Sequence, residues 1–145
     1  MTILDAYAVI AFLRAEPAAD RVRDLINTSN GSLTAVGLAE VVDHLVRLVG
    51  VNEEEALLDL AQLGLLEAVA IDPSLGVAAG RLRAARYHRT RCVVSLADCL
   101  AAVTARATSR PLATSDPHLL TVCHLEGIDT VALVDTTGTL WTPPD

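Results

Sequence analysis

Three aspartates draw attention because each is the only charged residue in an otherwise apolar stretch. Asp5 follows the segment TIL and is the only charge ahead of Arg14. Asp98 lies inside LADCLAAVTA, and Asp116 follows LATS. A buried carboxylate without a partner is costly and tends to take up a proton, and no Lys or Arg stands close to any of the three in the sequence. A metal cation shared by all three would compensate this cost.

Each aspartate can also be interpreted as a helix cap. Asp5 precedes the first predicted helix, and Asp116 precedes Pro117, a residue favoured at the first helical position. Ser95 and Asp98 have the capping-box spacing, in which the acid accepts a hydrogen bond from the cap residue's N–H. Aspartate is a common N-cap, so capping accounts for each residue taken singly.

Glu40 is a fourth candidate with a weaker signal. It lies on a predicted helix whose polar stripe consists of Gly37, Glu40, His44 and Arg47. Such a stripe is typical of a solvated face, and Glu40 could pair with His44 one turn further on. Glu40 becomes a site residue only if something connects it to the aspartates.

The elements that would position these acids alternate along the chain. The predicted strands cover residues 2–4, 32–34, 66–71, 111–114 and 130–134. The predicted helices cover 6–15, 17–27, a long helix capped by Thr34 and reaching Val49, 53–63, 74–88, a helix capped by Ser95 and reaching Ala107, and a short stretch from Pro117. This alternation predicts an α/β fold with a mostly parallel sheet covered on both faces. Ligands of such sheets bind beyond the carboxyl ends of the strands.

Length and composition limit the classes of protein. The chain has 145 residues with 52% apolar content and 3% aromatic residues, which predicts one domain over residues 1–145 with an aliphatic core. No apolar run reaches the length of a membrane span, and the N-terminus lacks the pattern of a signal peptide. Three widely spaced cysteines predict reduced thiols and a cytoplasmic protein. The net charge of −7 disfavours general nucleic-acid binding and suits a basic partner or a metal ion.

The basic residues are all arginine and gather in one segment, RLRAARYHRTR. Five of the 11 arginines lie there: Arg81, Arg83, Arg86, Arg89 and Arg91. The segment is a candidate for phosphate contacts, with Tyr87 and His88 available to stack on unpaired bases. The alternative is a solvated helix end whose positive charges favour the helix dipole.

Other chemistries lack the residues they need. The cysteines and His124 have no zinc-finger spacing, and Cys99 is expected to be a small core residue. The chain has neither a Gly-rich phosphate loop nor a G-x-S-x-G elbow. Tyr7 stands two residues after Asp5, where a haloacid-dehalogenase-like phosphotransferase has a second aspartate.

The acid-bearing segments, taken in order, connect all four candidates. LDAY at Asp5, LAEVV at Glu40, SLADCLAA at Asp98 and LATSD at Asp116 resemble the PIN-domain ribonucleases, and more closely the VapC-type toxins of bacterial toxin–antitoxin pairs. The resemblance covers nearly the whole chain. It departs at Asp43 and His44, where the family often has apolar or aromatic residues, and at Cys99, where a small residue is commoner.

The resemblance implies a three-layer α/β/α domain in which Asp5, Glu40, Asp98 and Asp116 converge and hold Mg²⁺ or Mn²⁺. Asp5 and Asp98, in the driest segments, are expected as direct ligands, while Glu40 and Asp116 hold metal-bound waters or a second ion. Thr114 or Ser115 is expected to hydrogen-bond an acid or the phosphate.

The implied activity is that of a metal-dependent endoribonuclease that acts on RNA. The implied partners are a small antitoxin that occludes the acidic groove and a second copy in a homodimer. Two alternatives stay open: a non-catalytic acidic module that docks a basic partner, and a metal-dependent phosphatase of small molecules. Capping alone would leave the acids at separate helix ends, whereas catalysis requires them to meet.

Overall fold

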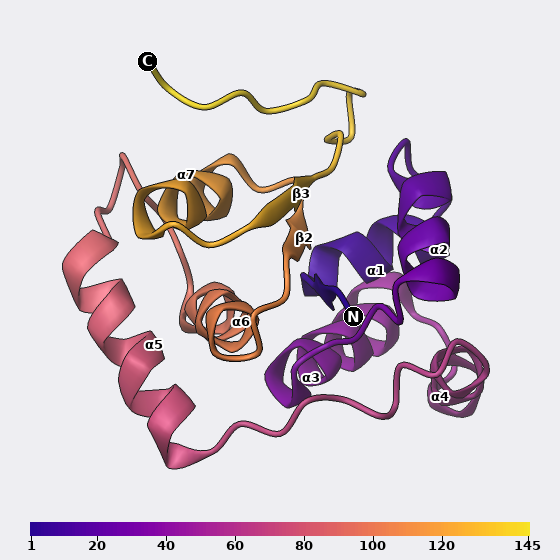
Figure 1. Ribbon diagram of the computed structural model, residues 1–145. Helices are drawn as coiled ribbons and strands as arrows, with labels where there is room; N and C mark the ends of the chain where they lie inside the picture. Colours follow the sequence, from indigo (N-terminus) through magenta and orange to yellow (C-terminus); the bar gives the residue numbers. More distant parts are fainter.

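A computed structural model describes residues 1–145 and shows helices arranged around a small parallel sheet (Figure 1). In chain order the elements are β1 (Ile3–Leu4), α1 (Ala6–Leu13), α2 (Ala19–Thr28), α3 (Ala35–Asp43), the π-helix η1 (His44–Val49), α4 (Glu53–Gln62), α5 (Pro73–Arg86), α6 (Leu96–Ala107), β2 (Leu112–Thr114), α7 (Pro117–Glu126) and β3 (Thr130–Ala132). Every predicted helix is present, with ends that differ by a few residues.

The sheet is parallel throughout. Its three named strands lie in the order β1-β2-β3, with Ile3 opposite Leu112. Single parallel bridges extend it on the β1 side, from Ile3 to Ser32 and from Thr34 to Val69. The predicted strand over 66–71 is therefore too long: at this edge only Val69 exchanges backbone hydrogen bonds, with Leu33 and Ala35. The last strand is shorter than the predicted 130–134 and ends at Ala132.

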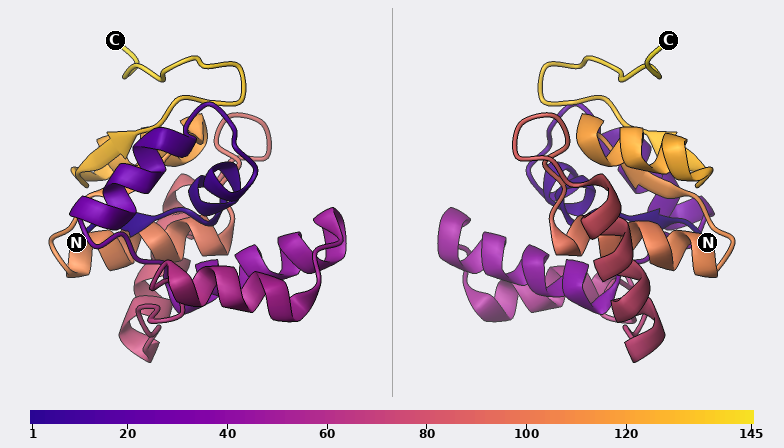
Figure 2. Two further views of the ribbon diagram at one scale, coloured as in Figure 1. Left: turned by 90° about the vertical axis from the view of Figure 1, so that its right-hand side faces the viewer. Right: turned by 90° about the vertical axis from the view of Figure 1, so that its left-hand side faces the viewer.

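Helices cover both faces of the sheet, as Figures 1 and 2 show. Successive strand residues point to opposite faces. Leu4 and Ala113 accordingly pack in a core with residues of α1, α2, α3 and α4. Ile3 and Leu112 pack in a second core with residues of α5, α6 and α7. The predicted three-layer α/β/α arrangement is confirmed.

The helix predicted to reach Val49 changes its winding part-way. Thr34 caps it as expected, because its Oγ1 accepts a hydrogen bond from the N–H of Gly37 at 2.9 Å. From His44 to Val49, however, the chain is π-helical, and it ends at Gly50, whose φ is +81°. Figure 2 shows α3, η1 and α4 projecting together from the body of the molecule. π-Helical turns are uncommon and often occur near functional sites.

Two further sequence predictions concern helix hydrophobicity and the cysteines. No helix is both long and apolar enough to cross a membrane. All three cysteines are free thiols. Cys99, on α6, is completely buried in the second core, which confirms its expected role as a small core residue.

Candidate active site

Asp5 and Asp116 follow neighbouring parallel strands and therefore lie at the same edge of the sheet. Asp5 comes directly after β1, and Asp116 comes two residues after β2. Thr114, the last residue of β2, connects them: its Oγ1 donates to Asp5 Oδ2 at 2.8 Å and accepts from the N–H of Asp116 at 3.1 Å. The expectation that Thr114 hydrogen-bonds an acid is confirmed. Asp5 is only 5% exposed and makes no side-chain cap to α1, so the capping interpretation of Asp5 is wrong.

Asp98 and Asp116 do cap helices. Asp98 Oδ2 accepts from the N–H of Ser95 at 2.8 Å, while Ser95 Oγ accepts from the N–H of Asp98 at 3.0 Å. Asp116 Oδ1 accepts from the N–H of His118 at 2.8 Å. These capping roles are compatible with a shared site. In parallel α/β folds the helices run against the strands, so helix N-termini lie at the edge where the strands end.

Glu40, on α3, is half-buried and has no ion-pair partner. The alternative in which it pairs with His44 is not seen. The His44 ring instead packs edge-on against Tyr7, with ring centroids 5.9 Å apart, and its Nε2 is buried without a hydrogen-bond partner. Burial raises the pKa of Glu40, and the carboxylate of Asp98 raises it further. Glu40 therefore belongs electrostatically with the aspartates.

The four acids line two adjoining hollows. The first has a volume of about 320 Å³, and its lining includes Asp5, Tyr7 and Asp116. The second has a volume of about 290 Å³, and its acidic lining is Glu40, Asp98 and Asp116. Tyr7 and Asp116 border both hollows. We call this concave region, with Asp5, Glu40, Asp98 and Asp116 on its walls, the acidic groove.

The carboxyl groups of the acidic groove repel one another. Burial raises the pKa of Asp5 to about 7, and the charges of Asp98, Glu40 and Asp116 contribute, against the opposing hydrogen bond from Thr114. Burial also raises the pKa of Asp98, with a contribution from Asp116 and opposition from its hydrogen bonds with Ser95. None of the four ion pairs in the structure involves these acids. Arg14 lines the first hollow and Arg83 the second, but neither forms an ion pair with these acids, so their negative charges are not neutralised by direct pairing.

This donor set suits a hard divalent cation. Mg²⁺ prefers oxygen ligands and keeps several waters, so one or two direct carboxylates are sufficient. No group of three or more His, Cys, Asp or Glu side chains is arranged so that it could hold a metal ion directly. Asp5 Oδ2 and Asp98 Oδ2 each accept one hydrogen bond, so both carboxylates keep lone pairs free for a metal ion. The residues fit an ion bound by two carboxylates and water.

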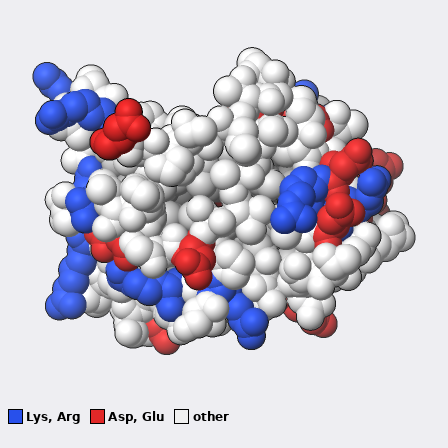
Figure 3. Space-filling model, turned by 45° about the horizontal axis from the view of Figure 1, so that its top comes forward, with Lys and Arg blue, Asp and Glu red and all other residues white.

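The arginine segment divides into engaged and free side chains. Arg83 donates from Nε to the carbonyl oxygen of Val94 at 2.9 Å, and Arg86 donates from Nε to Glu126 at 2.8 Å. The remaining three are exposed and form no ion pair: Arg81, Arg89 and Arg91. Figure 3 shows basic side chains along the left edge of the molecule, where α5 and the following loop lie.

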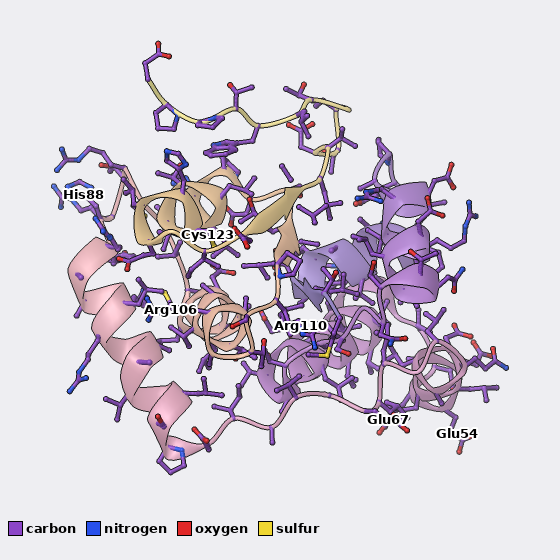
Figure 4. The ribbon with its side chains drawn as sticks, viewed as in Figure 1. Glu54, Glu67, His88, Arg106, Arg110 and Cys123 are labelled. Atoms are coloured by element: carbon purple, nitrogen blue, oxygen red, sulfur yellow. The ribbon has the colours of Figure 1, made fainter.

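His88 lies on that loop, at the margin of the molecule, as Figure 4 shows. Its Nδ1 accepts backbone hydrogen bonds from Thr90 and Arg91, so it organises the loop.

The sequence alone did not predict that Tyr7 and Arg83 line the groove. Tyr7 could have been found, because a side chain in the first turn of a helix lies at the same sheet edge as the strand-end acid just before it. The sequence marked Arg83 only as one of five arginines in the candidate phosphate-contact segment, with nothing to place it in the groove. It lines the second hollow because α5 packs along α6, whose first turn carries Asp98, and this packing is a tertiary feature.

The comparisons with known proteins concern the fold and the family. Among solved structures, the fold is similar to the crystal structure of FitAcB from Neisseria gonorrhoeae, with a TM-score of 0.64 and 20% sequence identity; the match covers 90% of this chain and 96% of that chain. No curated protein is significantly similar in sequence. Residues 2–125 match the family model of the PIN domain, and PIN domains are generally nucleases. Because this match includes all four acids and most of the chain, the protein belongs to the PIN domain family.

Proposed function

We propose that this PIN domain is a divalent-metal-dependent endoribonuclease and the toxin component of a toxin–antitoxin pair. The acidic groove carries the proposal, because four carboxylates that form no ion pair gather there, near the carboxyl ends of parallel strands. The resemblance of all four acid segments to VapC-type toxins supports the toxin role. RNA is the substrate, and its phosphodiester bonds are hydrolysed.

The side chains of the groove have different tasks in this proposal. Asp5 and Asp98 hold Mg²⁺ or Mn²⁺ directly, and Thr114 and Ser95 orient their carboxylates through the hydrogen bonds described above. Glu40 and Asp116 hold water molecules beside the ion or bind a second ion. When bound, the ion would polarise the phosphodiester and lower the pKa of a bound water.

The proposed partners follow from charge and exposed apolar surface. An antitoxin segment with basic residues suits a groove in a chain of net charge −7. Exposed apolar surface on the projecting helices η1 and α4 favours a homodimer contact. The exposed apolar side chains there are Val46, Leu48, Val49, Leu57 and Leu58.

A non-catalytic docking module is a weaker candidate for a specific reason. Acids that dock a basic protein must be accessible to it, whereas Asp5 is 5% exposed. Burying a carboxylate among other carboxylates costs folding free energy. Such an arrangement is typical of functional sites, where the carboxylates can bind a cation.

The test is cleavage of end-labelled RNA by the purified protein, with Mg²⁺ or with chelator. We expect cleavage only with the metal, and a loss of roughly 100-fold or more in Asp5→Asn and Asp98→Asn. Asp129→Asn is the matched control, since Asp129 is an exposed acid at the opposite edge of the sheet, just before β3. Equal cleavage by Asp98→Asn and the parent contradicts the proposal. Hydrolysis of p-nitrophenyl phosphate without RNA cleavage would instead indicate the phosphatase.

A further inference from the structure

Both tyrosines of this chain lie on the same hollow of the acidic groove. The sequence contains two tyrosines, Tyr7 and Tyr87, and both line the hollow that holds Glu40, Asp98 and Asp116. Tyr7 is 56% exposed and Tyr87 is 43% exposed. Aromatic residues make up only 3% of the chain, so two exposed rings on one hollow form an unusual concentration.

Tyr7 has a fixed orientation despite its exposure. It lies in the first turn of α1, two residues after Asp5, and the His44 ring packs against it at an interplanar angle of 82°. This contact is edge-to-face, a favourable geometry for aromatic pairs. A ring that is held from one side and open on the other is suited to stacking with a planar ligand.

Tyr87 has a different neighbour, because the guanidinium of Arg83 lies over its ring at 4.3 Å from the centroid. Arg83 is further fixed by the hydrogen bond from its Nε to the carbonyl oxygen of Val94. It is the only basic residue that lines this hollow, and it forms no ion pair with the acids there. Its terminal Nη groups are therefore available to an anion, with the side chain already positioned.

We propose that Tyr7 and the Arg83–Tyr87 pair form a nucleotide-positioning subsite, in which Tyr7 stacks on the base beside the scissile phosphate and Arg83 binds a phosphate further along the strand. The inference rests on the proposed ribonuclease function and assigns the residues that seat the substrate. The stacking contact with the base and the ionic contact with the phosphate together fix the position of the RNA strand relative to the acids. A base inside a duplex cannot offer its face to Tyr7, so the subsite selects unpaired nucleotides.

The test separates the base contact from the phosphate contact. Binding of a short fluorescent single-stranded RNA and of an abasic oligomer with the same number of phosphates is measured by anisotropy, in the Asp98→Asn background to prevent cleavage. We expect Tyr7→Leu to weaken binding of the intact RNA roughly tenfold and to leave the abasic oligomer unaffected, while Tyr7→Phe binds like the Tyr7 protein. Arg83→Gln should weaken both ligands equally and reduce the salt-dependence slope by roughly 0.7.

Arg21→Gln is the charge-matched control, because Arg21 is an exposed arginine on α2, outside the groove and without an ion pair. If Tyr7→Leu and Arg83→Gln both bind RNA like Arg21→Gln while the parent cleaves RNA with Mg²⁺, the subsite is wrong and the ribonuclease stands. If Tyr7→Leu weakens the abasic oligomer as much as the intact RNA, Tyr7 does not stack on a base. If the parent neither binds nor cleaves RNA, both proposals are wrong.

Discussion

At the level of single residues, the four acids of the groove differ in what holds them. Thr114 orients Asp5, the backbone N–H of Ser95 orients Asp98, and helix N–H groups orient Asp116. Asp5 is the most deeply buried of them and is repelled by the other three, and its pKa is raised the furthest. The cost of burying a carboxylate beside other carboxylates should therefore be measurable through Asp5.

We predict that without divalent cations Asp5 makes the fold less stable as pH rises from about 4 to about 7. Its pKa is about 7 in the folded protein against 3.8 for a free carboxyl, so the folded state binds a proton that the unfolded chain has already released. Asp5→Asn has no carboxyl group at this position, so its free energy of unfolding does not fall with the ionisation of Asp5. The variant should therefore become more stable than the parent through that range, by an amount on the order of a few kcal/mol. The measurement is urea unfolding in chelator across the pH range.

The Asn side chain can still accept the hydrogen bond from Thr114, so this substitution mainly removes charge. Asp129→Asn should follow the pH dependence of the parent. If the Asp5→Asn and parent curves stay parallel between pH 4 and pH 7, burial and the neighbouring carboxylates do not raise the pKa of Asp5 as described.

A second prediction separates Arg86 from Arg89, which the sequence presents as equivalent phosphate-contact candidates. Arg86 is 34% exposed and paired with Glu126, which also lies 3.5 Å from Arg106. Arg86→Gln should therefore lower the free energy of unfolding by about 1 kcal/mol. Arg89 is exposed and unpaired, so Arg89→Gln should leave stability unchanged and weaken RNA binding. Chemical denaturation and salt-dependent RNA binding of both variants measure this, and equal stability of the two contradicts it.

At the level of elements, the residues at strand ends and helix starts were predictable because their signals are local. The capping box of Ser95 and Asp98 and the cap of Asp116 follow from residue type and spacing. The π-helical winding from His44 has no comparable local signal, and it accompanies the contact of His44 with Tyr7. The reduction of the predicted strand over 66–71 to one bridge at Val69 has no local signal either, because it depends on which backbone groups form hydrogen bonds across the sheet.

A third prediction concerns the start of α6, where capping and metal binding use the same carboxylate. Ser95→Ala removes the cap acceptor for the N–H of Asp98 and should cost about 1 kcal/mol, with or without Mg²⁺. Ser95→Ala keeps the carboxylate of Asp98, so Mg²⁺ should still raise the melting temperature of this variant.

Asp98→Asn should respond to Mg²⁺ far less than the parent, because bound metal stabilises only the protein that binds it. Thermal melts with chelator and with Mg²⁺ compare the three proteins. Equal Mg²⁺ responses of the parent and Asp98→Asn contradict this account and leave Asp98 as a cap only.

At the level of the whole molecule, the topology gathers acids that are far apart in the sequence. Asp5 and Asp116 follow adjacent strands, while α3 and α6, which carry Glu40 and Asp98, pack against each other. The resemblance to PIN-domain ribonucleases implied this convergence, and the rule that ligands bind beyond the carboxyl ends of parallel strands indicated the edge of the sheet where it would lie. The shape of the groove was not predictable, because it depends on the side chains that α5 presents, and their packing beside α6 has no local pattern in the sequence.

The final prediction concerns the effect of the whole protein on a bacterial cell. An endoribonuclease expressed without its antitoxin destroys RNA that the cell needs, so expression of the parent alone should arrest growth. Asp98→Asn should relieve the arrest, since Asn retains the shape of the side chain but not the charge that a divalent ion requires. Growth curves at matched expression, with sequencing of RNA ends soon after induction, measure both effects, and new RNA ends should appear only with the active protein. Asp129→Asn should arrest growth like the parent, because this exposed acid lies away from the groove. Arrest by Asp98→Asn at the rate of the parent, with the same RNA ends, would show that Asp98 has no part in cleavage.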